Sequence, residues 1–269
     1  CKLLMVNNFA QKGIVDRMHR HFVAVAINIW GDREVTALDG KATTEKDFAR
    51  AMNVQFTPTL LFFDEAGKVV ARLNGYYPPH RFEAVLDYVA GKRERSESLS
   101  AYLGHAAREP ANPKLADQPF FRKPPYDLTR RPGDKPLAVV FETTDCAGCD
   151  ELHNASFKRR EVLAQVERFD VVRLSLGAAT PVTLPDGRKS NAQAWARDLK
   201  VVYAPTIVLF DAAGTEVFRL EAFLRPFHVS GALAYVADGA YRAEPSFQRY
   251  LQLRTEALRA KGQHVDLME

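Results

Sequence analysis

The sequence predicts an α/β protein in which one structural unit occurs twice, at about residues 1–90 and 136–240. Residues 57–67 read TPTLLFFDEAG and residues 204–214 read APTIVLFDAAG, at an offset of 147 positions. Within the second copy, short apolar runs alternate with segments of helical periodicity, a pattern typical of α/β units. A proline-rich segment separates the two copies.

The repeat extends along most of both copies. The offset of 147 also joins residues of identical type: Asp39 with Asp186, Arg72 with Arg219, Pro79 with Pro226, and Tyr88 with Tyr235. An offset of 148, one insertion away, joins Cys1 with Cys149 and Phe9 with Phe157. A colinear series of this length indicates duplication of one unit.

Composition agrees with two globular domains. The chain has 269 residues, and domains average roughly 150 residues. Its apolar share of 46% and charged share of 26% exclude a disordered or fibrous protein. No apolar run approaches the roughly 18 residues of a membrane span, so we expect no membrane insertion. The net charge of +4 is spread along the chain without an aromatic–basic motif, so we expect no nucleic-acid partner.

The second copy supplies the clearest order of elements. Apolar, β-branched runs predict buried strands, and charged residues at helical spacing predict exposed helix faces. Two strands joined by a short turn that contains glycine predict a hairpin. The expected elements are a strand at 137–141, a helix at 150–169, a strand at 171–176, a helix at 191–199, a hairpin of 206–211 and 216–221, and a helix at 226–236. This order, βαβαββα, predicts a mixed sheet with helices on both faces.

The proline-rich segment sets the predicted domain boundaries. Residues 107–136 hold seven of the 15 prolines, which favours an extended, semi-rigid linker. Its aromatic residues Phe120, Phe121 and Tyr126 indicate that it packs on the second unit. We therefore predict a first domain at 1–106, a linker at 107–135 and a second domain at 136–269. A trailing helix is expected in each domain, at about 94–107 and 245–260.

The cysteines carry the candidate chemistry. There are three, and Cys146 and Cys149 form a C-x-x-C pair where a predicted strand ends and a helix begins. A helix N-terminus favours negative charge, so it stabilises a thiolate. The thiolate is the attacking species in disulfide exchange, so Cys146 is the candidate nucleophile and Cys149 the candidate resolving residue.

Other roles for the pair remain open. Cys146, Cys149 and His153 have a spacing that metal sites use, but zinc prefers four ligands and no further cysteine lies nearby. We therefore expect no metal and no cofactor. An inert pair is the second alternative. His153 itself is interpreted as a residue on the exposed face of the helix.

The order strand, C-x-x-C, helix, strand, helix, loop, proline, strand, strand, helix resembles the thioredoxin fold. The resemblance covers both copies and implies two thioredoxin-like domains. It implies that the Thr57–Pro58 and Ala204–Pro205 bonds are cis, and that these four residues bind an extended substrate beside the dithiol. The block Pro-Thr-hydrophobic-Phe-Asp-x-x-Gly is similar to bacterial periplasmic thioredoxin-related proteins, including those associated with sulfur oxidation.

The resemblance implies a thiol–disulfide oxidoreductase that acts on protein disulfides in the periplasm. Its partners would be protein thiols or disulfides and a protein electron donor or acceptor. The alternative is a thioredoxin-like module that binds a protein without turnover. The sequence departs from the family at one position, because Val140 stands where thioredoxin has a buried acid. Glu142 lies on the same strand face and is a candidate for proton transfer.

Cys1 is the third candidate catalytic residue. Its pairing with Cys149 makes it the second cysteine of another C-x-x-C, and Pro58 follows it at nearly the distance that separates Pro205 from Cys149. We expect a natural chain that extends upstream with a strand, the first cysteine and a signal peptide. The alternative is a lipidated cysteine at the start of a mature lipoprotein.

Overall fold

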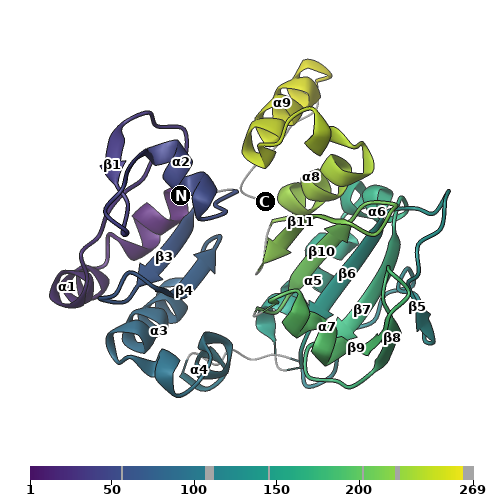
Figure 1. The fold of residues 1–269 in the computed structure, drawn as a ribbon, viewed down its shortest axis with the longest axis horizontal. Helices are drawn as coiled ribbons and strands as arrows, with labels where there is room; N and C mark the ends of the chain where they lie inside the picture. Colours follow the sequence, from purple (N-terminus) through teal and green to yellow (C-terminus); the bar gives the residue numbers. More distant parts are fainter. Residues whose placement is uncertain (56, 107–111, 145, 202, 222–224, 263–269) are drawn as a thin grey trace. The chain divides into compact units, whose positions relative to one another are not determined.

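The computed structural model describes residues 1–55, 57–106, 112–144, 146–201, 203–221 and 225–262. The chain forms two compact units, Cys1–Arg108 and Glu109–Glu269 (Figure 1). The second unit thus begins inside the segment predicted as a linker. Each unit is described by itself.

A four-stranded mixed sheet, in the order β11-β10-β6-β7, forms the centre of the second unit. Its strands are β6 (Leu137–Glu142), β7 (Asp170–Ser175), β10 (Thr206–Phe210) and β11 (Glu216–Glu221). β6 runs parallel to β7 and antiparallel to β10. Every residue of β6 and β10 is buried, as expected for central strands covered on both faces. The predicted strands of this unit are confirmed to within one residue at each end.

Helices cover this sheet. They are α5 (Ala147–Asn154), η3 (Ser156–Lys158), α6 (Arg160–Val166), α7 (Ala192–Asp198), α8 (Pro226–Ala237), η4 (Ala240–Arg242) and α9 (Phe247–Ala260). α5 and α7 cover opposite faces of the sheet, because adjacent residues of β6 meet them: Glu142 contacts His153 of α5, and Phe141 contacts Trp195 of α7. In the core, the Trp195 ring of α7 stacks on Phe210 at 5.7 Å and meets the edge of Phe141 at 5.9 Å between ring centroids.

The prediction of one helix over 150–169 is wrong, because the chain breaks into α5, η3 and α6. Cys149 and His153 of α5 are buried, and so are Val162 and Val166 of α6. At 3.6 residues per turn, a single straight helix would point these two pairs in nearly opposite directions. The extended backbone at Arg159 (φ −81°, ψ 131°) starts a new helix and lets both pairs face the core.

The proline-rich segment packs on the second unit, as its aromatic residues predicted. Phe121 is buried and forms a bridge with Val171 of β7, and the amide of Arg122 donates to the Val171 carbonyl at 2.8 Å. Further along, β5 (Tyr126–Asp127) joins β8 (Pro181–Thr183) and β9 (Lys189–Asn191) in a small three-stranded sheet. This sheet was not predicted, because its strands are only two or three residues long.

The first unit contains α1 (Lys12–His21), α2 (Glu45–Ala51), α3 (Pro79–Ala90) and α4 (Leu99–Ala106), with short helical segments η1 (Leu4–Asn8) and η2 (Arg93–Arg95). Its strands form two hairpins, β1 (Glu34–Thr36) with β2 (Ala42–Thr44), and β3 (Thr59–Phe63) with β4 (Val69–Asn74). The helix expected at 94–107 starts later, because the Ser98 hydroxyl accepts a hydrogen bond from the Ala101 amide and caps α4.

The sheet of the first unit is smaller than that of the second. Among the described residues, β3 pairs only with β4, and all five of its residues are half-buried. Residues 22–27 correspond to β7 in the repeat but form no strand, and Val23 is 93% exposed. The fully buried side chains of this unit include Phe82, Val85 and Leu86 of α3. In the part of the chain that the structure describes, no helix has the length and apolar character needed to cross a membrane.

Candidate active site

Cys146 and Cys149 form a disulfide at the start of α5, with 5.2 Å between their Cα atoms. Cys146 has extended backbone angles and occupies the N-cap position, where its sulfur accepts a hydrogen bond from the Cys149 amide at 3.1 Å. Cys149 is only 5% exposed, whereas Cys146 is half-buried. The helix N-terminus therefore places amide donors at the sulfur that is more open to solvent, which stabilises a thiolate there.

The Ala204–Pro205 bond is cis, and Pro205 is buried immediately before β10. Thr206 of β10 lies opposite Phe141 of β6 in the sheet register. Continuing this antiparallel register by one residue brings Pro205 opposite Glu142, the last residue of β6. The proline and the chain leading to α5 therefore meet at the same end of the sheet.

A buried acid–histidine pair lies behind the disulfide. Oε1 of Glu142 is 2.9 Å from Nε2 of His153, and the two side chains are 1% and 3% exposed. The interpretation of His153 as an exposed helix residue is wrong. It follows Cys149 by four positions, so both side chains lie on the inward face of α5, with Cβ atoms about 5–6 Å apart. That spacing was the sequence signal for its burial.

The second nitrogen of His153 contacts the proline-rich segment. Its Nδ1 atom is 3.0 Å from Nε2 of Gln118, which sequence reasoning missed. Rings of Phe121 and Phe157 surround the imidazole, with centroids 5.8 Å and 5.4 Å away. Gln118 lies in no helix or strand, so no periodicity in the sequence could have indicated this contact.

The hydrogen bonding of Glu142 is incomplete. Its second carboxyl oxygen, Oε2, is buried and has no hydrogen-bond partner among the described residues. A buried carboxylate oxygen without a donor is costly, and such atoms often mark catalytic groups. Close to the disulfide, Asp150 carries another carboxylate in the first turn of α5, where it accepts the Asn112 amide at 2.7 Å.

The other candidate residues belong to the first unit. Cys1 is exposed and is not in a disulfide. The Thr57–Pro58 bond is cis and precedes β3, as Ala204–Pro205 precedes β10. Cys146 and Cys149 bond to each other, so Cys1 has no cysteine partner in the described part of the chain.

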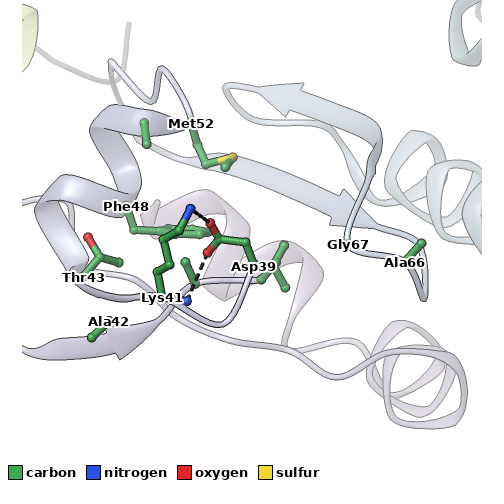
Figure 2. Close-up of a pocket in the computed structure, with 11 residues that line it drawn as sticks. Asp39, Lys41, Ala42, Thr43, Phe48, Met52, Ala66 and Gly67 are labelled. Atoms are coloured by element: carbon green, nitrogen blue, oxygen red, sulfur yellow. Dashed lines mark hydrogen bonds and ion pairs between the residues drawn. The ribbon is translucent and has the colours of Figure 1, made fainter.

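An open pocket of about 550 Å³ also lies in the first unit (Figure 2). Apolar side chains of Leu38, Phe48 and Met52 contribute to its lining, and Asp39 and Lys41 form a 2.7 Å ion pair there. None of the predicted site residues lines it. Among the described residues, no group of three or more His, Cys, Asp or Glu side chains could hold a metal ion.

A model of the thioredoxin-like domain matches residues 1–90 and 129–237. No curated protein matches the chain. Similar solved structures include a thioredoxin-fold protein from Helicobacter pylori, at 19% identity and a TM-score of 0.42, covering 49% of this chain and 89% of that one. A thioredoxin from Thermus thermophilus has 23% identity and a TM-score of 0.33, with coverages of 41% and 80%. The periplasmic thioredoxin SoxS from Paracoccus pantotrophus has 20% identity and a TM-score of 0.30, with coverages of 39% and 99%.

Proposed function

Since this chain belongs to the thioredoxin-like domain family, which matches it in both units, we propose that it is a thiol–disulfide oxidoreductase acting on protein disulfides. The proposal rests chiefly on the disulfide between Cys146 and Cys149, in which the more accessible sulfur is the N-cap of α5. A sulfur at that position is stabilised as a thiolate and can be reached by a substrate.

In the reducing direction, the Cys146 thiolate attacks one sulfur of a substrate disulfide. The substrate S–S bond breaks, a mixed disulfide forms, and the first substrate thiolate leaves and takes a proton from water. Cys149 then loses its proton and attacks the Cys146 sulfur, which releases the second substrate thiolate. The substrate gains two electrons and the cysteine pair loses two. The oxidising direction uses the same steps in reverse, with a protein acceptor or donor completing the cycle.

The second step requires an acceptor for the proton of Cys149, because a neutral thiol is a poor nucleophile. We assign this role to Glu142. Its Oε2 atom has no hydrogen-bond partner among the described residues, and the side chain is held beside α5 by His153. The position differs by two residues from the acid of thioredoxin but lies on the same strand face.

The sequence resemblance supports the other parts of the proposal. Ala204 and Pro205 would bind the substrate backbone beside the Cys146 sulfur, and Thr57 and Pro58 would form the equivalent surface of the first unit. The proposal keeps Cys1 as the resolving residue of a second dithiol, on the basis of its offset of 148 from Cys149. The periplasm as the location, tandem duplication as the origin and the predicted domain boundaries belong to the same proposal.

A redox titration tests the function. The protein is equilibrated in buffers of graded thiol–disulfide ratio, its free thiols are alkylated, and the modified Cys146 and Cys149 are counted by mass spectrometry. We expect one reversible two-electron couple, loss of disulfide reduction in Cys146→Ser, and trapped mixed disulfides in Cys149→Ser. Cys1→Ser is the matched control and should leave this couple in place. Normal activity of Cys146→Ser would refute the enzymatic proposal.

A binding module without turnover is the second candidate. The same titration separates the two functions, since a binding module would show no reversible couple while still retaining a partner protein in Cys146→Ser.

A further inference from the structure

We infer that the proline-rich segment contributes to the redox site through Gln118. The Gln118 side chain holds His153 in the tautomer that leaves Glu142 able to accept a proton. The inference rests on the proposed function and extends it to two positioning residues, Gln118 and His153. Neither residue would touch the substrate. Both would act through the carboxyl group of Glu142.

The hydrogen bonds define the tautomer. The side-chain NH₂ group of Gln118 can only donate, so Nδ1 of His153 accepts its hydrogen bond at 3.0 Å. A neutral imidazole carries one proton, which must then be on Nε2. Nε2 donates this proton to Oε1 of Glu142 at 2.9 Å. Both hydrogen bonds in this series, from Gln118 to His153 and from His153 to Glu142, therefore have their donors pointing toward the carboxyl group.

The opposite tautomer of His153 would require the carboxyl group of Glu142 to be protonated. With the proton on Nδ1, the lone pair of Nε2 would face Oε1 of Glu142, and the two acceptors would repel each other. The contact would survive only if Glu142 carried the proton itself. A protonated carboxyl group cannot accept the proton of Cys149, so the resolving step would lose its acceptor.

Solvent does not set the tautomer, because the imidazole is enclosed. His153 is 3% exposed, and the rings of Phe121 and Phe157 meet it edge to face. Gln118 is the partner of Nδ1, and it comes from a segment 35 positions earlier in the chain. Phe121 and the side-chain amide of Gln118, both from this segment, therefore act together on His153.

Charged groups around the pair come from three elements. Arg173 of β7 lies 5.7 Å from the centroid of the Phe121 ring and 3.9 Å from Asp117 of the segment. Lys123 of the segment forms an ion pair with the same Asp117. Asp150 lies on α5 one position after Cys149. None of these charged side chains is altered in the variants that test the inference.

The segment stays in place without Gln118. The Arg122 amide donates to Val171, the Arg173 side chain donates to the Ala116 carbonyl, and Phe121 is buried against the unit. Replacement of Gln118 thus removes one hydrogen bond while these anchors remain. Gln118→Met keeps the length of the side chain without a donor, and Gln118→Glu turns the donor into an acceptor.

The first test reads the tautomer directly. Nitrogen-15 NMR of His153 should show a proton on Nε2 and none on Nδ1 in the unaltered protein. In Gln118→Glu, Nδ1 should be protonated, because a carboxylate accepts. Gln252→Glu introduces the same charge on the exposed side of α9 and should leave the imidazole unchanged. A proton on Nδ1 in the unaltered protein would overturn the inference.

The second test separates the two chemical steps. Reduced protein is mixed with a small aromatic disulfide that releases a coloured thiolate at each step, and the two releases are followed by stopped-flow absorbance. We expect Gln118→Met to leave the first release unchanged and to slow the second about tenfold, the equivalent of one hydrogen bond's net contribution. The deficit should narrow as pH rises, because hydroxide then removes the Cys149 proton.

The outcomes distinguish the inference from the function on which it rests. If the unaltered protein shows no release, the oxidoreductase proposal fails, while the NMR experiment still reports the tautomer. If both releases are unchanged in Gln118→Met at every pH, Gln118 has no positioning role. If the second release in Gln118→Met is slowed by the same factor at every pH, the positioning role is also contradicted. A slowing of that kind indicates a purely structural defect, which does not depend on hydroxide.

Discussion

Tyr88 and Tyr235, which are 147 positions apart, make the same hydrogen bond in the two units. Each hydroxyl donates to the main-chain oxygen of the glutamate nine residues later, Glu97 at 2.8 Å and Glu244 at 2.7 Å. Arg72 and Arg219 repeat a contact in the same way, donating from Nη1 to the carbonyls of Met52 at 2.7 Å and Leu199 at 2.9 Å. The repeat is therefore visible in long-range contacts as well as in residue identity.

The tyrosine contact should stabilise each unit to a similar extent. Tyr88→Phe and Tyr235→Phe each leave a carbonyl without this donor, so each should lower the free energy of unfolding by about 1 kcal/mol. Each unit holds one of the two tryptophans, Trp30 and Trp195, so urea unfolding of Trp30→Phe and Trp195→Phe backgrounds reports on one unit at a time. An effect in only one unit would mean that the hydrogen bonds are not energetically equivalent.

Alkaline pH should destabilise the second unit through Tyr235. Burial, followed by the charge of Glu244, raises the pKa of Tyr235 from 10.0 to about 12. A group whose pKa is raised on folding stabilises the fold fully below its unfolded pKa and loses that contribution as pH rises through the folded value. Stability should therefore fall between pH 10 and about 12. Thermal melts followed by Trp195 fluorescence should show a weaker fall in Tyr235→Phe, and an identical fall in both would contradict the assignment.

Hydrogen exchange should distinguish the central strand of one unit from its counterpart in the other. β10 is bonded to β6 on one side and β11 on the other, whereas β3 is bonded to β4 alone among the described residues. We expect the amides of Leu60 to Phe62 that point away from β4 to exchange orders of magnitude faster than those of Ile207 to Leu209. Residue-resolved exchange measured by NMR provides the comparison. Equal protection would show that another group covers the open side of β3.

The buried pair of Glu142 and His153 should be strongly coupled. His153→Leu leaves the buried carboxyl group without its donor, a loss of about 3 kcal/mol, and Glu142→Leu leaves a buried N–H without its acceptor, a loss of about 2 kcal/mol. The double variant removes both polar groups, so it should lose clearly less than the sum. Urea unfolding of the four proteins gives the coupling energy. Strict additivity would mean that the hydrogen bond contributes nothing.

Residue 204 is proposed to influence which substrates the second unit accepts. Ala204 has no polar side chain, while its counterpart Thr57 carries a hydroxyl that can donate to an extended substrate. Ala204→Thr should change the relative rates at which Cys146 reduces a set of peptide disulfides by several fold. The matched control is Ala213→Thr, an exposed residue in the hairpin turn after β10. Unchanged relative rates would leave residue 204 without a role in specificity.

Local sequence signals were sufficient for the repeat, the strands of the second unit and the C-x-x-C motif at a strand–helix junction. Each of these depends on residues that are close together in the chain or on a comparison of the chain with itself. Leu137 to Phe141 are apolar because the strand is buried on both faces, so its position is evident from composition alone. The break between α5 and α6 was missed, because no proline or glycine stands between Asp150 and Phe169 to mark it.

The surroundings of the dithiol were decided by tertiary structure. The sequence places Glu142 on the correct strand face and His153 one turn after Cys149, but periodicity does not reveal what covers that turn. The cover is Gln118 with Phe121, which lie outside the helices and strands and hence in no repeating pattern. Its contact with His153 spans 35 positions, and a hydrogen bond at that distance depends on how the segment packs against β7. The amino-acid sequence determined which residues carry the thiol chemistry, whereas only the packed fold determined which polar groups control the proton beside them.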